Sequence, residues 1–182
     1  MITIKVNLDA RELEGTLARV VDAMRDTTPL MQELAQVMSE ASDRAFATET
    51  DPVTGARWVR LNPDYQAQLT LHGFTGTMLQ RHGLLKNSLR VEAGHLYARI
   101  GSNLRYAAIH QFGGTTRPHW IHPRDKKALA FRRHGRQYIR GKVFHPGSEI
   151  PRRRFLGVGA QDKQDMKEVI LDYLREAFKT KR

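Results

Sequence analysis

Cysteine is absent from this chain of 182 residues, which excludes disulfide cross-links, thiolate catalysis and zinc sites built on cysteine. Long apolar runs are absent as well, because no window approaches the roughly 18 residues of a membrane-spanning helix. The mean hydropathy of −0.54 indicates a large polar surface. The first residues alternate apolar and polar side chains instead of forming the apolar block of a secretory signal. We therefore expect a soluble protein that is made in a cytoplasm and has no membrane partner.

Motifs for catalysis are also missing. The sequence contains no phosphate-binding glycine loop, no nucleophile elbow and no obvious pair of acids for general acid–base work. His119 and His122 have the spacing of two metal ligands on a helix, but Pro118 and Pro123 flank them and disfavour a helix. Zinc needs several convergent ligands, and Asp125 is alone nearby. The sequence thus predicts no enzyme, no cofactor and no metal site.

Hydrophobic periodicity divides the chain into helical and extended segments. Apolar residues recur with helical spacing in 13–24, 30–46 and 166–178, and they alternate with polar residues in 2–8 and 89–101. This order is typical of an α+β fold. We expect a small antiparallel β-sheet packed by an N-terminal helical hairpin and a C-terminal amphipathic helix, with a basic extended hairpin or arm.

Almost all of the net charge of +11 lies in residues 115–154, whereas residues 1–114 have as many acids as bases. The segment has two acids, Asp125 and Glu149. Its twelve bases are Arg117, Arg124, Lys126, Lys127, Arg132, Arg133, Arg136, Arg140, Lys142, Arg152, Arg153 and Arg154. A charge this concentrated repels itself, so we expect a polyanion or an acidic protein surface to neutralise it.

Two interpretations of this basic segment remain open. It contains aromatic residues between the bases, namely Trp120, Phe131, Tyr138, Phe144 and Phe155. Proteins that bind single-stranded nucleic acid contact its phosphates with basic side chains and stack its nucleobases on aromatic side chains. The other interpretation is a β-hairpin with one apolar and one basic side, in which 127–132 and 137–145 pair around His134-Gly135.

Four short stretches carry a resemblance when they are read together. They are Pro52-x-x-Gly55-x-x-Trp58, Gly83–Leu89, Tyr106–Gly114 and Ile150–Gly157. In this order they resemble the phage virion morphogenesis family, which includes the Mu-like protein G and the P2-like tail completion protein S. The chain is more distantly similar to HK97-type neck and tail-completion proteins. Members of the family usually have proline where Arg154 stands.

The resemblance implies a structural subunit of the virion, assembled in the host cytoplasm. Such a subunit forms a ring, expected to be a hexamer, in the neck or at the tail terminus, where it completes the tail and supports head–tail joining. Its expected partners are its own copies and other phage tail tube, neck or connector proteins, with DNA in the channel as a further partner. The alternative is a nonspecific DNA-binding protein that uses residues 115–154.

The family motifs are expected to determine the fold. Those residues are Pro52, Gly55, Trp58, Tyr106, Gln111, Phe112, Gly113, Gly114, Pro151 and Phe155. A short helix over 104–112 is expected to pack Tyr106, Ala107 and Phe112 against the core and to end at the two glycines. We expect residues 1–182 to form a single domain, with 115–150 as a protruding insertion. The twelve basic residues of 115–154 are expected to contact a neighbouring subunit or DNA.

Overall fold

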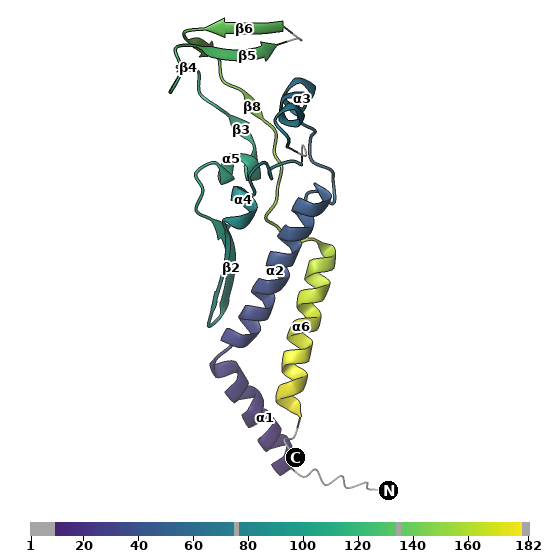
Figure 1. Ribbon diagram of the computed structural model, residues 1–182. Coiled ribbons are helices and arrows are strands. Elements are labelled where there is room, and N and C mark those ends of the chain that lie inside the picture. The colour runs from purple at the N-terminus through teal and green to yellow at the C-terminus, as the bar shows by residue number, and fades with distance from the viewer. Residues whose placement is uncertain (1–9, 75–76, 134–135, 180–182) are drawn as a thin grey trace, which may run out of the picture. The chain divides into compact units, whose positions relative to one another are not determined.

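The computed structural model of the chain describes residues 10–74, 77–133 and 136–179 (Figure 1). The strand expected at 2–8 lies outside them. The contacts of the backbone divide the chain into two units. Unit 1 consists of Met1–Ala41, Arg90–Ile100 and Val158–Arg182, and unit 2 consists of Ser42–Leu89 and Gly101–Gly157. The single domain with a protruding insertion stays a prediction.

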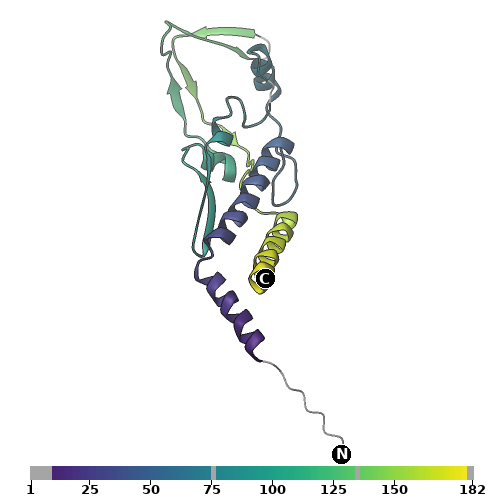
Figure 2. The same ribbon diagram turned by 60° about the horizontal axis from the view of Figure 1, so that its bottom comes forward.

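Unit 1 is built from the helices and the hairpin that the periodicity predicts. The elements are α1 (Ala10–Arg25), the first part of α2 (Thr28–Thr48), most of the hairpin of β1 (Leu89–Gly94) and β2 (Tyr97–Ser102), and α6 (Ala160–Phe178). Helix α6 packs against α1 and runs alongside the helical pair (Figures 1 and 2). The Tyr173 hydroxyl donates a hydrogen bond to the carbonyl of Ala23 at 2.8 Å.

The junction between α1 and α2 is held by polar side chains. The Asp26 carboxylate accepts the N–H of Thr28 at 2.9 Å. Hydrogen bonding from the side chain of Thr28, and then from its backbone N–H, lowers the pKa of Asp26. Thr27 is buried, and its hydroxyl accepts the N–H of Leu96 at 3.1 Å. Its own N–H donates to Nδ1 of His95 at 3.2 Å. The turn of the β-hairpin is thereby attached to the helical junction.

Unit 2 surrounds an aromatic core. Phe46 lies on α2, and its ring meets Trp58 edge to face at 5.9 Å between centroids and Phe155 at 5.4 Å. All three side chains are buried. Two short helices contribute to this core, α4 (Leu84–Asn87) and α5 (Ala107–Phe112), and the unit also contains the short helix α3 (Pro63–Leu71). Leu85 of α4 and Ala107 of α5 complete the apolar cluster.

The basic segment is a ladder of short antiparallel pairs, one after another (Figure 1). From base to tip these are β3 (Gly114–Thr115) with β8 (Glu149–Ile150), β4 (His119–Ile121) with β7 (Val143–His145), and β5 (Leu129–Arg133) with β6 (Arg136–Arg140). We call residues 114–150 the arm. No described residue from 115 to 150 is buried.

The predicted pairing within the arm is correct at its tip and wrong further down. Strands β5 and β6 confirm a hairpin there, and the turn at His134-Gly135 lies outside the described residues. Residues 143–145, however, pair with 119–121 instead of 127–132. The reason is an asymmetry in length: residues 122–128 separate β4 from β5, whereas only 141–142 separate β6 from β7. Pro123 in the longer connection cannot donate a ladder hydrogen bond.

The α+β prediction is confirmed, with the β-structure divided into two-stranded antiparallel sheets. None of the helices in the described ranges is both long enough and apolar enough to cross a membrane.

Candidate functional site

Helix α5 turns Ala107 and Gln111 toward the core, one helical turn apart. Ala107 is buried. Oε1 of Gln111 accepts the backbone N–H groups of Phe155 and Leu156, each at 3.0 Å, and its amide donates to the carbonyl of Leu156 at 2.7 Å. Gln111 therefore fixes the segment through which the chain leaves the arm.

The prediction that Tyr106 and Phe112 pack with Ala107 is wrong. Tyr106 is 42% exposed and Phe112 is 74% exposed. Successive residues of an α-helix are rotated by about 100°, so neither aromatic shares the face that Ala107 and Gln111 define. A helix of six residues is too short for the periodicity of its apolar side chains to indicate which face is buried.

Gly113 ends α5, as predicted, with a φ of +76°. Its N–H donates to the carbonyl of Ile109 at 2.9 Å. A Cβ at this position would lie 3.1 Å from the backbone nitrogen of Arg152 and 3.2 Å from the carbonyl oxygen of Ile150. Glycine is required here both by the backbone conformation and by the close approach of the returning strand.

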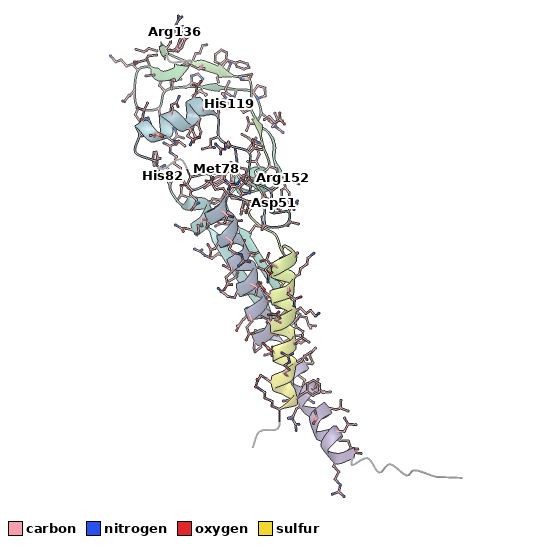
Figure 3. All side chains as sticks on the ribbon, turned by 90° about the vertical axis from the view of Figure 1, so that its right-hand side faces the viewer. Asp51, Met78, His82, His119, Arg136 and Arg152 are labelled. Carbon is pink, nitrogen blue, oxygen red and sulfur yellow. The ribbon has the colours of Figure 1, made fainter. Side chains whose placement is uncertain are left out.

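Asp51 organises the turn that follows α2. Its carboxylate is buried and accepts the N–H of Val53 at 2.8 Å, while Gly55, at a φ of +71°, donates its N–H to the Asp51 carbonyl at 2.7 Å. Two arginines approach the same carboxylate, Arg154 at 3.7 Å and Arg152 at 4.0 Å. Figure 3 labels Asp51 and Arg152. Arg154 thus has an ionic partner inside the subunit.

Arg153, between those two arginines, is a buried cation. It is 7% exposed, and its Nε donates to the carbonyl of Val59 at 2.9 Å. Among the described residues no carboxylate forms an ion pair with it. Burial lowers the pKa of its guanidinium, and the charge of Glu49 opposes that effect. Two of the predicted contact residues, Arg153 and Arg154, thus differ from those of the arm, because their side chains bind groups of their own subunit.

A pocket of about 620 Å³ opens beside Arg153. We call it the Arg153 pocket. Its charged and titratable lining comes from Arg81, His82, His110, Glu149 and Arg153. Most of the remaining lining is apolar, and it includes Leu61, Leu69, Leu79, Leu84, Leu85 and Ile150. Nδ1 of His110 is buried and has no hydrogen-bond partner in the described structure. Burial and then the charge of Arg153 lower the pKa of His110.

The other predicted contact residues lie along the arm. Those with described side chains are all exposed: Arg117, Arg124, Lys126, Lys127, Arg136, Arg140 and Lys142. None of these side chains forms an ion pair with a described carboxylate. The side chains of Arg132 and Arg133 are outside the described set. The arm therefore carries several exposed arginine and lysine side chains whose positive charge no described carboxylate neutralises.

Aromatic side chains form pairs across the same arm. Trp120 and Phe144 are opposite each other, with ring centroids 5.2 Å apart, and both are about half exposed. The ammonium of Lys142 lies 4.8 Å from the Trp120 ring centroid. Phe131 and Tyr138 stack at 5.6 Å in the next pair of strands. The arm thus combines exposed cations with exposed rings.

The histidines of the arm lie differently from metal ligands on a helix. His119 is in a strand and stacks on His145 at 5.3 Å. No group of three metal-ligating side chains gathers anywhere in the described ranges.

The remaining motif residues lie in or near the core of unit 2. Trp58 and Phe155 belong to the core, and Pro52 and Pro151 are half-buried. Pro151 also lines the Arg153 pocket. Sequence reasoning had grouped Arg153 with the exposed bases of the arm. It missed the pocket, because no local pattern shows that Arg153 turns inward beside His110.

Comparison with known proteins agrees with the motifs. The model of the phage virion morphogenesis family matches residues 8–175. The chain is 34% identical over 115 residues to "Putative capsid assembly protein G" of Escherichia phage Mu, which covers 63% of this chain and 73% of that protein. It is 29% identical over 179 residues to "Mu-like prophage FluMu G protein 2" of Haemophilus influenzae, across 98% of this chain and 100% of that protein.

No solved structure matches the chain. The family match extends from the start of the described helices almost to the end of α6, so it includes all four motifs and the arm. The chain belongs to the phage virion morphogenesis family.

Proposed function

We propose that the protein is a structural subunit of the neck or tail terminus of a phage particle. Copies form a ring, a hexamer, which completes the tail and supports head–tail joining. The subunit carries out no catalysis and needs no cofactor. It assembles in the host cytoplasm and remains in the virion, in contact with tail tube, neck or connector proteins.

The exposure of the arm is the observation that carries this proposal. The arm exposes aromatic rings such as Trp120 and Phe144, and its basic side chains have no described acidic partner. Such a ribbon contributes little to the core of its own subunit. In a ring, one surface of each subunit meets an unlike surface of the next, and the interface closes by rotation. The arm supplies a surface of that kind, and an acidic tube or neighbouring subunit is the complementary one.

A reconstruction of the intact particle tests the proposal. The expected result is a ring of six copies at the head–tail junction, with residues 115–150 of each copy against another subunit or the tube. Copies in the capsid shell, or the absence of the chain from finished particles, would refute the position in the neck or tail.

Arm variants extend this test to the contact itself. Trp120→Ser with Phe144→Ser removes two exposed rings, so folding should be unchanged while joined particles decrease and separate heads and tails accumulate in electron micrographs. The matched control is Val59→Ser with Val91→Ser, because both valines are large exposed apolar side chains outside the arm. Normal particle yield with the arm variant would count against an assembly contact there.

Nonspecific DNA binding is the second candidate, because exposed basic residues such as Arg140 and Lys142 occur on the arm together with the exposed ring of Trp120, and nucleic-acid binders combine these two kinds of side chain. A mobility-shift assay with duplex and single-stranded DNA at several salt concentrations tests it. If DNA is the partner, log K falls against log salt by about 0.9 for each phosphate contacted. Absence of binding by the isolated subunit at low salt would eliminate this candidate.

A further inference from the structure

Arg153 presents an unusual electrostatic situation in the Arg153 pocket. Its side chain is more than nine-tenths buried, and guanidinium does not lose its proton in proteins. A buried cation without a contacting carboxylate is unfavourable, because hydrogen bonds to carbonyl oxygens and the charge of Glu49, which forms no ion pair with Arg153, compensate it only in part. Its Nε donates to the Val59 carbonyl at 2.9 Å and its Nη2 to the Arg60 carbonyl at 3.5 Å, and no described acid forms an ion pair with it.

A second polar group in the same pocket is incomplete. Nδ1 of His110 is buried without a partner in the described structure. His110 is joined to Arg153 through the backbone, because the N–H of Arg153 donates to the His110 carbonyl at 2.8 Å. A cation, Arg153, and a histidine with an unpartnered ring nitrogen, His110, thus line one pocket.

The other charged and titratable groups around the pocket leave this imbalance in place. Arg81 and His82 line it from the segment before α4, and both side chains are exposed. Glu149 of β8 is the acid in the lining, and it is exposed and makes no ion pair with Arg153 or Arg81. Within the lining, the formal charges of the two arginines therefore exceed that of Glu149, and Glu49 acts on Arg153 from outside the lining.

The size and the apolar lining of the pocket indicate what kind of molecule carries the missing charge. Its volume of about 620 Å³ is within the range of pockets that take a few side chains or a small ligand. Leu69, Leu79 and Leu85 contribute to its wall. Phosphate oxygens of DNA carry no apolar groups that these leucines would bury, whereas a peptide with leucine-like residues beside an acid does.

We propose that the Arg153 pocket binds an acidic side chain, flanked by apolar residues, from an exposed segment of another protein. The carboxylate pairs with Arg153 and accepts from His110, and the neighbouring apolar side chains contact the leucines. The inference rests on the assembly role proposed above only in that the segment belongs to another virion protein.

The binding assay uses the full-length protein and short peptides. The probe is acetyl-Leu-Glu-Leu amide, and the comparison peptide has Gln in place of Glu. The ring signals of His110 are followed by NMR and are assigned with the variant His110→Gln. The Glu peptide should shift these signals saturably and raise the pKa of His110, because a nearby carboxylate favours the charged imidazolium. The Gln peptide should bind at least about tenfold more weakly, as expected for the loss of a charged partner.

Inorganic phosphate and a DNA duplex are titrated under the same conditions. Equal binding of the Glu and Gln peptides would show an apolar groove without charge selection and overturn the inference. Tighter binding of phosphate or of DNA than of the Glu peptide would overturn it in favour of a general anion site. No response of His110 to any probe would overturn it as well.

Two variants locate the binding. Arg153→Gln should abolish binding of the Glu peptide, with Arg105→Gln as a matched control, because Arg105 is exposed and does not line the pocket. If Arg153→Gln does not fold, Leu84→Asp provides the test. Leu84 is 62% exposed and lines the pocket, so a carboxylate there should repel the peptide without disturbing the core.

Leu96→Asp is the control for that change, since Leu96 is 67% exposed and lies outside the pocket. Undiminished binding by Leu84→Asp would refute the site. Because the assay needs no particle, its failure is distinguishable from the failure of the ring proposal, which is decided by the reconstruction.

Discussion

Trp58 donates its indole N–H to the backbone carbonyl of Arg154 across 2.9 Å, and this bond joins the turn after α2 to the segment that follows the arm. The indole is buried against Phe46, so the bond lies at the centre of the unit 2 core. Residues nearly a hundred positions apart in the chain are thereby held at one point.

Trp58→Phe should lower the free energy of unfolding by roughly 1–3 kcal/mol. The smaller ring keeps most of the apolar contact but leaves a buried carbonyl without its donor. Urea denaturation measures the change. The control is Val59→Ala, next in sequence and 58% exposed, which should alter stability by less than about 0.5 kcal/mol. Equal stability of Trp58→Phe and the parent chain would show that the bond contributes nothing.

Gln111→Met should destabilise the protein by roughly 2–4 kcal/mol, because two N–H groups and one carbonyl lose their partner together. Gln111→Glu keeps the acceptor for both N–H groups and should recover part of the loss. Thermal denaturation distinguishes the three proteins. Phe112→Ser serves as the control because its side chain is 74% exposed. A larger loss for Phe112→Ser than for Gln111→Met would contradict the assignment of the inner face of α5.

Gly113→Ala should lower the free energy of unfolding by about 1–3 kcal/mol. The φ of +76° is strained for alanine, and the added Cβ meets the backbone at Arg152. Gly141→Ala is the matched change, because no atom lies within 4 Å of the Cβ it would add. Equilibrium unfolding of both variants gives the comparison, and equal effects would argue against a special requirement at Gly113.

Stability should decrease as the pH falls through the range of His110. Burial and Arg153 lower the pKa of His110 in the folded state, so the unfolded chain binds more protons at this site. The contribution of neutral His110 is therefore fully present above the ordinary histidine pKa of about 6.5 and is lost progressively below it. His110→Gln should remove that part of the slope between roughly pH 7.5 and 5 in urea melts. An unchanged slope would show that His110 does not titrate differently on folding.

The long elements were predictable because their signal is local. Leu13, Leu17 and Val20 repeat with helical spacing, and the α1 that they predict is present. The hairpin of β1 and β2 was equally readable from its alternation and from Gly94 near the turn. Such patterns need no knowledge of distant residues.

The rest depends on contacts far apart in sequence. Nothing near Arg153 shows that it turns toward Val59, while its neighbour Arg152 remains exposed. The pairing of Trp120 with Phe144 was missed for a similar reason, since it depends on the unequal connections on the two sides of the arm. The composition correctly identifies a basic segment, but only the tertiary structure distinguishes the exposed arginines and lysines of the arm from the buried Arg153.

The nested pairing of the arm has a consequence for how this family can change. Gly114 faces Ile150 at the base, and the strands beyond them pair in turn up to Arg133 and Arg136. Residues added or removed in equal numbers on both strands alter the ribbon by about 3.3 Å per pair and leave the base register intact. The length of the arm is thus adjustable in small steps, independently of the aromatic core of unit 2.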